Sequence, residues 1–147
     1  MLRAILWDND GVLVDTEGLY FQASREALER LGIRLSEAHF IERFLKASEG
    51  LARITDEHGI DEQTLEPARI WRNARYTELL RAGVHVIDGA HQVLRQLHGT
   101  VRMGIVTSSR REHFEIIHAD TGLLDWIDFT LVREDYRHSK PDPEPYL

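Results

Sequence analysis

Residues 5–17 read Ile-Leu-Trp-Asp-Asn-Asp-Gly-Val-Leu-Val-Asp-Thr-Glu, and the class of fold that we expect follows from them. The apolar run from Leu2 to Trp7 ends abruptly in Asp-Asn-Asp-Gly, which predicts a buried parallel strand followed by a tight polar loop. Asp8 and Asp10 are two residues apart. Because two residues is the repeat of an extended chain, both carboxylates can face one cleft. Such a pair suits a hard cation or nucleophilic and acid/base chemistry, but the same residues are also common in surface turns.

The rest of the chain divides into helix-like and strand-like segments. Apolar residues at helical spacing predict helices over 16–31, 36–45, 48–58, 61–80, 88–96 and 110–119, with no strand signal between residues 16 and 80. Two further apolar runs, residues 101–106 and 129–132, predict buried strands. Alternating strands and helices indicate an α/β fold with parallel strands and right-handed crossovers. We expect a Rossmann-like parallel sheet with three visible strands, interrupted by a block of short helices.

Polar side chains also follow the second predicted strand, at Thr107, Ser108 and Ser109. In an open parallel sheet, ligands lie beyond the carboxyl ends of the strands, so this cluster should lie near Asp8. Its hydroxyl and N–H groups could bind phosphate at the start of the next helix, or simply cap that helix. Lys140, in a loop before a proline, is either a cation that reaches the phosphate or a solvated surface charge.

Composition excludes several classes of function. The 147 residues carry a net charge of −7, which argues against general nucleic-acid binding. The chain has no cysteine, so disulfide scaffolds, thiol nucleophiles and cysteine-bound metals are excluded. No apolar run approaches the roughly 20 residues that span a membrane, and we expect no membrane association, no signal peptide and a cytoplasmic location. The eight histidines show no metal-like spacing and are interpreted as structural or surface residues.

Together, these features resemble the haloacid dehalogenase superfamily, in the branch that carries a helical cap after the first strand. The first motif of that family, an apolar strand followed by Asp-x-Asp-Gly, matches residues 5–17. The second, a strand ending in Thr or Ser, matches residues 104–108, and the third, a lysine followed by proline, matches residues 140–143. The resemblance spans the whole chain. It implies a core domain of residues 1–15 and 84–147 and a helical cap domain of residues 16–83.

The resemblance also implies a reaction: Mg²⁺-dependent hydrolysis of a small phosphorylated metabolite through an aspartyl-phosphate. Asp8 would be the nucleophile and Asp10 the acid and base. Both would bind Mg²⁺, Asp8 through its carboxylate and Asp10 through its main-chain carbonyl. The residues implied for phosphate binding are Gly11, Thr107, Ser108 and Lys140.

Two residues narrow the activity within the family, and a third bears on contact with the substrate. Members that dehalogenate lack the second aspartate, so Asp10 favours phosphoryl transfer. Sugar-phosphate mutases, a lesser alternative, carry a cap histidine about where Tyr20 stands here. Lys46 takes the place of a glycine that is frequent in the substrate-facing cap loop, and it could contact an anionic substrate or lie on the surface.

One part of the family pattern is missing. Relatives place a fourth motif, with one or two acidic residues that complete the metal site, on a strand after the lysine loop. This chain has seven residues after Lys140. We therefore expect a C-terminally incomplete core, weak metal affinity and an exposed edge on the first strand that favours self-association. The chain would be a fragment of a longer phosphatase or a poorly active variant. The alternative is a non-catalytic phosphate-binding or interaction domain.

Overall fold

The computed structural model describes residues 2–47 and 49–147, and its contacts divide the chain into two units. One unit comprises Met1–Thr16 and Leu80–Leu147, and the other comprises Glu17–Leu79. The first contains all the strands and the second is helical. The domain boundaries expected from the sequence, and the role of the helical block as a cap, stay predictions.

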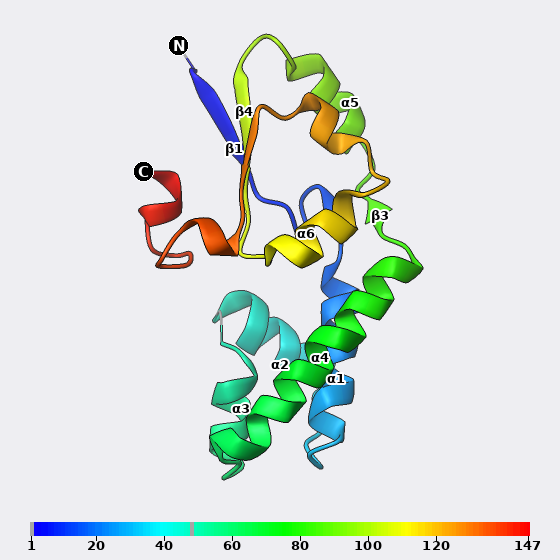
Figure 1. The fold of residues 1–147 in the computed structure, drawn as a ribbon, viewed down its shortest axis with the longest axis vertical. Helices are drawn as coiled ribbons and strands as arrows, with labels where there is room; N and C mark the ends of the chain where they lie inside the picture. Colours follow the sequence, from blue (N-terminus) through cyan, green and yellow to red (C-terminus); the bar gives the residue numbers. More distant parts are fainter. Residues whose placement is uncertain (1, 48) are drawn as a thin grey trace. The chain divides into compact units, whose positions relative to one another are not determined.

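The three strands expected from the sequence form one parallel sheet, which confirms the α/β fold (Figure 1). Its members are β1 (Ala4–Trp7), β4 (Arg102–Val106) and β5 (Phe129–Leu131), in the order β1-β4-β5. Trp7 pairs with Ile105, and Ile105 pairs with Thr130. Because this register aligns the carboxyl ends of the strands, the segments that follow them leave the sheet at one edge.

The core of this unit packs between the sheet and two helices. These are α5 (Ala90–Leu97) and α6 (Arg111–His118). Short 3₁₀ segments follow at η2 (Leu123–Trp126), η3 (Arg133–Asp135) and η4 (Glu144–Tyr146). The largest fully buried apolar side chains of the unit are Leu13, Leu94, Met103, Ile105, Leu123, Val14, Val106 and Val132. Four of the five β4 residues are buried, as expected for the middle strand of the sheet.

A second, two-stranded sheet was not expected from the sequence. Strands β2 (Val14–Asp15) and β3 (His85–Val86) pair antiparallel, with Val14 opposite Val86 and Asp15 opposite His85. Two-residue strands are too short to produce a periodic pattern, so the sequence gives no signal for them. The pairing holds together the two points where the chain leaves and re-enters the α/β unit.

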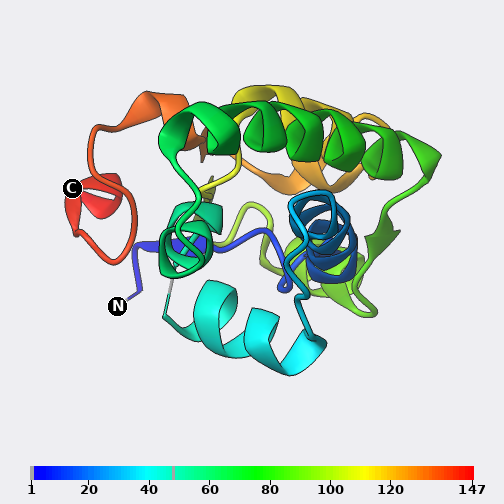
Figure 2. The same ribbon diagram turned by 90° about the horizontal axis from the view of Figure 1, so that it is seen from below.

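The helical unit contains the four expected helices. They are α1 (Glu17–Glu29), α2 (Glu37–Phe40) continued by the π-helix η1 (Ile41–Lys46), α3 (Leu51–Glu57) and α4 (Glu62–Ala82), of which α4 extends into the other unit. In Figure 2, α1 and α3 lie between the long helix α4 and the α2–η1 segment. Their shared apolar core consists of Leu28, Ile33, Leu35, Phe40, Phe44, Leu51, Ile54 and Leu65.

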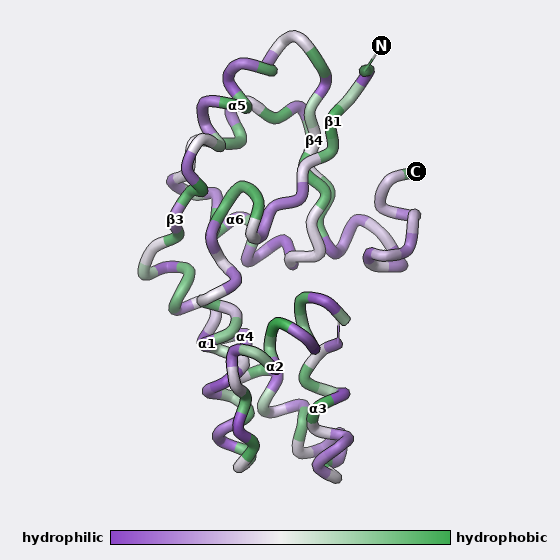
Figure 3. The backbone as a smooth tube through the Cα atoms, turned by 180° about the vertical axis from the view of Figure 1, so that it is seen from behind, coloured by the Kyte–Doolittle hydropathy of each residue, from purple (hydrophilic) through white to green (hydrophobic). Residues whose placement is uncertain are grey.

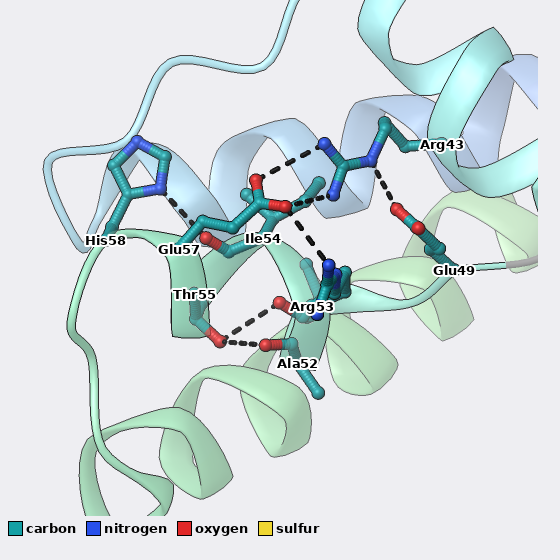
Figure 4. A network of polar contacts seen from close by, with 9 residues as sticks. Arg43, Glu49, Ala52, Arg53, Ile54, Thr55, Glu57 and His58 are labelled. Carbon is teal, nitrogen blue, oxygen red and sulfur yellow. Dashed lines mark hydrogen bonds and ion pairs between the residues drawn. The ribbon is translucent and has the colours of Figure 1, made fainter.

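An arginine fastens the π-helix to α3 (Figure 4). The two terminal nitrogens of Arg43 donate to Glu57, at 2.6 and 3.2 Å, and its Nε donates to Glu49. Hydrogen bonding from this guanidinium holds the pKa of Glu57 below its usual range, and the ion pair with Arg53 acts in the same direction. The cluster is partly exposed to solvent, so salt will weaken it.

Strand β1 lies at an edge of the sheet, and within residues 2–47 and 49–147 its ladder partner is β4 alone. Figure 3 shows the strand as a largely hydrophobic stretch. Leu6 is 39% exposed and alternates with the half-buried residues Ile5 and Trp7. No helix in the described part of the chain is long and apolar enough to cross a membrane.

Candidate active site

Asp8 and Lys140 form an ion pair just beyond the end of β1. The chain leaves the sheet after Trp7, so the Asp8 side chain lies at the carboxyl edge, where it is 50% exposed. Lys140 Nζ donates to Asp8 Oδ1 at 2.8 Å and to the main-chain oxygen of Val106 at 3.2 Å. The loop lysine therefore lies in the sheet-edge cluster and is not an isolated surface charge.

Asp10 is held quite differently, by hydroxyl groups. Thr16 Oγ1 donates to Asp10 Oδ1 at 2.6 Å. Ser109 Oγ and Thr107 Oγ1 donate to the other carboxylate oxygen, at 2.8 and 3.2 Å. Three donors from two chain segments thus fix the orientation of this carboxylate. The two aspartates have distinct surroundings, since one pairs with a cation and the other with neutral hydroxyls.

The turn that carries both aspartates is organised around Asn9. Its main-chain carbonyl accepts from the N–H groups of Val12, Leu13 and Val14, at 3.2, 2.8 and 3.2 Å. Gly11 has a φ of +76°, a conformation that glycine adopts at little cost, and its N–H donates to Val14. The predicted surface turn is therefore a real turn, but the Asn9 side chain is fully buried within it.

The polar cluster after β4 faces Asp10 and does not cap α6. Helix α6 begins at Arg111 with Arg110 as its N-cap residue and no side-chain cap, so the capping interpretation of this cluster is wrong. Thr107 is fully buried, and Ser108 next to it is exposed. Thr107 Oγ1 accepts from the Ser109 N–H at 3.0 Å, and its main-chain oxygen accepts from the Tyr136 hydroxyl at 2.7 Å.

Side chains within the loop of residues 137–144, which carries Lys140, hydrogen-bond to main-chain N–H groups of the same loop. Glu144 accepts from the N–H groups of Arg137 and His138, at 3.0 and 2.8 Å, and Asp142 accepts from the N–H of Glu144 at 2.9 Å. The ligand atoms of His138, Asp142 and Glu144 lie within 4.8 Å of one another. Both carboxylates already accept main-chain hydrogen bonds. We therefore interpret this cluster as a set of contacts that orders the loop around Lys140, and not as a metal site.

Two residues of this site, Thr16 and Tyr136, were not expected from the sequence, and Ser109 was expected only as part of the polar cluster. Thr16 and Ser109 both bind the Asp10 carboxylate, and Tyr136 anchors the strand end at Thr107. Ser109 belonged to the polar cluster, and Thr16 to the motif, but nothing in their spacing showed that both would point at one carboxylate. The signal for Tyr136 is absent from the sequence.

Two residues singled out in the helical unit have partners within that unit. The Tyr20 hydroxyl accepts from Arg72 at 2.8 Å, and its ring lies against Tyr76 with the centroids 5.3 Å apart. Lys46 pairs with Glu42, one helical turn earlier, at 2.6 Å. Contact of Lys46 with a substrate stays a prediction.

The oxygen atoms at the end of β1 fit Mg²⁺, which takes hard oxygen ligands and keeps several of its waters. The Asp8 carboxylate is exposed, and Lys140 engages one of its two oxygens. Both carboxylate oxygens of Asp10 accept hydroxyl hydrogen bonds, so Asp10 would offer its main-chain carbonyl. The chain would thus supply two oxygen ligands of different kinds.

Comparison with known proteins identifies relatives across the whole chain. A family model described as "Haloacid dehalogenase-like hydrolase" matches residues 5–147. Validoxylamine A 7'-phosphate phosphatase of Streptomyces hygroscopicus subsp. limoneus is 30% identical over 155 residues, which cover 99% of this chain and 68% of that protein. Phosphorylated carbohydrates phosphatase of Thermotoga maritima is 29% identical over 152 residues, with the same coverage.

A solved structure shares the fold. The β-phosphoglucomutase of Clostridium difficile superposes with a TM-score of 0.77 at 19% identity, over 99% of this chain and 68% of the other. At that identity the match is informative about the fold alone. The chain spans about two thirds of the length of each of these three relatives.

Proposed function

The chain belongs to the haloacid dehalogenase-like hydrolases, and on that premise we propose that it hydrolyses the phosphate ester of a small metabolite at Asp8 and Asp10. The observation that carries this proposal is the difference between the two carboxylates. Asp8 is half exposed and paired with the cation Lys140, whereas three hydroxyls hold Asp10 in place. A nucleophile must be accessible, and a proton donor must be oriented. The geometry therefore suits Asp8 as the nucleophile and Asp10 as the proton donor.

In the first step, an oxygen of Asp8 forms a bond to phosphorus while the bond between phosphorus and the ester oxygen breaks. Asp10, protonated at this stage, gives its proton to the departing oxygen, so the product leaves as an alcohol. Asp8 is left as an aspartyl-phosphate. The Thr16 and Ser109 hydroxyls keep the Asp10 carboxyl group aimed at the leaving oxygen throughout.

In the second step, the Asp10 carboxylate takes a proton from water, and the water oxygen attacks phosphorus. The bond from phosphorus to Asp8 breaks, which restores the carboxylate and releases inorganic phosphate. When bound by the Asp8 carboxylate and the Asp10 main-chain carbonyl, Mg²⁺ supplies positive charge that stabilises the phosphoryl oxygens.

Phosphate binding is assigned to groups around the two aspartates. Lys140 already reaches Asp8, so its ammonium group lies where it can neutralise an oxygen of the transferred group. Thr107 would contribute its hydroxyl by exchanging its hydrogen bond to Asp10 for one to a phosphoryl oxygen. Ser108, which is exposed, would contribute its main-chain N–H group. Gly11, also exposed, would lie against the phosphate, while its own N–H group donates to Val14.

The helical block of residues 16–83 is proposed as the cap that selects the substrate and excludes water. It has its own apolar core, and the β2–β3 pairing joins its two connections to the α/β unit. A module attached in this way can vary in sequence without disturbing the sheet. Phosphatases of sugar-like phosphates among the relatives make a phosphorylated carbohydrate a reasonable first substrate class.

Self-association is proposed at the β1 edge. Within the described residues this apolar strand has β4 on one side only, which leaves its other N–H and C=O groups available for pairing with a second chain.

Hydrolysis of 4-nitrophenyl phosphate by the purified chain tests the proposed function. We expect turnover that requires Mg²⁺ and is abolished in Asp8→Asn, which keeps the shape of the side chain and removes the nucleophilic charge. Asp125→Asn, a matched change in the exposed part of η2, should retain the wild-type rate. If the folded chain binds inorganic phosphate without turnover, the non-catalytic alternative replaces this proposal.

A further inference from the structure

A series of hydrogen-bonded polar side chains, of which Asn9 and His118 are buried, runs from the aspartate turn to the end of α6. Nε2 of His118 lies 2.7 Å from Oδ1 of Asn9, and Nδ1 of His118 lies 2.9 Å from the Thr121 hydroxyl. Asn9 is fully buried and His118 is 6% exposed. Asn9 and His118 are 109 residues apart in the sequence, so the contact joins the first loop of the fold to the end of a distant helix.

Which atoms donate and which accept in this series of hydrogen bonds follows from the groups that can only accept. Burial lowers the pKa of His118 to about 4, against an opposing effect of the Asp10 charge, so the imidazole is neutral at neutral pH. Because Asn9 Oδ1 can only accept, Nε2 carries the proton and donates it. Nδ1 then accepts from the Thr121 hydroxyl. Both nitrogens of the ring are satisfied in one tautomer.

The hydrogen bond from His118 compensates the buried amide group of Asn9. Its amide nitrogen Nδ2 is buried without a hydrogen-bond partner, so the bond from His118 is the side-chain interaction that offsets the burial of the amide. Two apolar side chains would fill the same space without unsatisfied polar atoms. We therefore interpret the Asn9–His118 pair as serving to orient the Asn9 side chain, since packing alone does not require polar groups.

The orientation of Asn9 matters because it is the centre of the aspartate turn. Its neighbours in the sequence are Asp8 and Asp10, and its carbonyl accepts the three N–H groups that fold the turn. A side chain that fixes Asn9 consequently fixes the peptide units on both sides of it. Each of the two carboxylates is attached one residue away from that fixed point.

We propose that His118 is a positioning residue for the aspartate turn, acting through its hydrogen bond to Asn9 on the placement of Asp8 and Asp10. Its importance for catalysis rests on the proposed function. Its importance for the geometry of the turn does not. The hydrogen bonds of the histidine go to Asn9 and Thr121 and not to either aspartate, and the Thr121 hydroxyl holds its ring in the required tautomer.

Hydrogen exchange tests the effect on the turn, measured by NMR at the amides of Val12, Leu13 and Val14. We expect His118→Leu to speed their exchange by about tenfold relative to the amides of α5, as the loss of a buried hydrogen bond predicts. Ile117→Ala, a change at a buried apolar neighbour on the same helix, is the matched control and should not accelerate these three amides selectively. His118→Gln, whose amide can donate to Asn9, should restore most of the protection.

Kinetics supply the second measurement, with 4-nitrophenyl phosphate as substrate. A positioning role predicts that His118→Leu lowers kcat by about tenfold and leaves KM within twofold, because the interaction lost serves the reacting geometry. If the wild-type chain shows no turnover, the proposed function fails, while the exchange rates still decide the positioning role.

A double variant keeps the proposal testable if His118→Leu does not fold. Asn9→Leu/His118→Leu replaces both partners by apolar groups, which should recover stability but not the protected turn or the wild-type kcat. Wild-type exchange at the three turn amides in either variant would overturn the proposal. So would selective acceleration of the same size in Ile117→Ala, or a nitrogen NMR spectrum of His118 with the proton on Nδ1.

Discussion

The ammonium nitrogen of Lys140 lies 2.8 Å from the carboxylate oxygen Oδ1 of Asp8, although 132 residues separate the two in the sequence. The contact arises because β1 ends at one edge of the sheet and the chain after β5 returns to that same edge. Lys140 Nζ also donates to the oxygen of Val106, the last residue of β4, so one cation meets the ends of two strands. Ligand sites of parallel sheets lie at this edge for the same topological reason.

Removing the Lys140 charge should weaken phosphate binding. We expect Lys140→Met to raise the Kd for inorganic phosphate, measured by calorimetry with Mg²⁺ present, by about tenfold or more, equivalent to roughly 1.4 kcal/mol. Lys140→Arg keeps the charge and should lose less. Arg95→Met removes an exposed cation of α5 as a control. An unchanged Kd in Lys140→Met would show that the ion pair with Asp8 is only structural.

The hydroxyl groups around Asp10 should matter for rate more than for substrate affinity. Ser109→Ala removes a donor at 2.8 Å from the Asp10 carboxylate. We expect about a tenfold fall in kcat for 4-nitrophenyl phosphate, the size of one hydrogen bond to an oriented charged group, with KM nearly unchanged. Thr100→Ala, a hydroxyl deletion at an exposed site in a loop, serves as the control. Equal kcat values in the two variants would remove Ser109 from the site.

Gly104 should tolerate no side chain, because it lies opposite Phe129 in the sheet. A Cβ atom added at Gly104 would lie 2.3 Å from Cζ of the Phe129 ring. We expect Gly104→Ala to lower the free energy of unfolding by about 1–3 kcal/mol through this overpacking, measured by urea denaturation. Combining it with Phe129→Leu, which removes the ring, should recover part of the loss. An additive double variant would contradict the proposed clash.

Acid should destabilise the protein through His118. The folded-state pKa is about 4, below the usual value of 6.5 for histidine, so between these values the unfolded state binds more protons. The stability contributed by the neutral histidine is therefore complete above about pH 6.5 and falls as pH drops toward 4, by a total of about 3 kcal/mol. Urea denaturation between pH 7 and 4 measures this loss. His118→Gln cannot titrate, so its stability should fall less over the same range. Parallel curves for the two proteins would contradict the assignment.

Much of the molecule was predictable because its signals are local. The apolar runs before Asp8 and Thr107 predicted parallel strands, and the helical spacing between residues 16 and 80 predicted a helical block. Those patterns depend on which side chains are buried over a few neighbouring residues, and this is visible directly in the order of apolar and polar residues. The order of the motifs was enough to expect Lys140 near Asp8.

The partners of each functional group needed the tertiary structure. Nothing in the spacing of Thr16 and Ser109 indicates that both bind Asp10, and the residues 9 and 118 carry no pattern that pairs them. The two-residue strands β2 and β3 are similarly invisible, since each is stabilised by the other and not by its own sequence. Local propensity can specify an element, but a hydrogen bond between distant residues forms only when the packing of the whole unit brings donor and acceptor together. In this protein the sequence determined the strands, the helices and the candidate reactive side chains, and the folded chain decided what holds them in place.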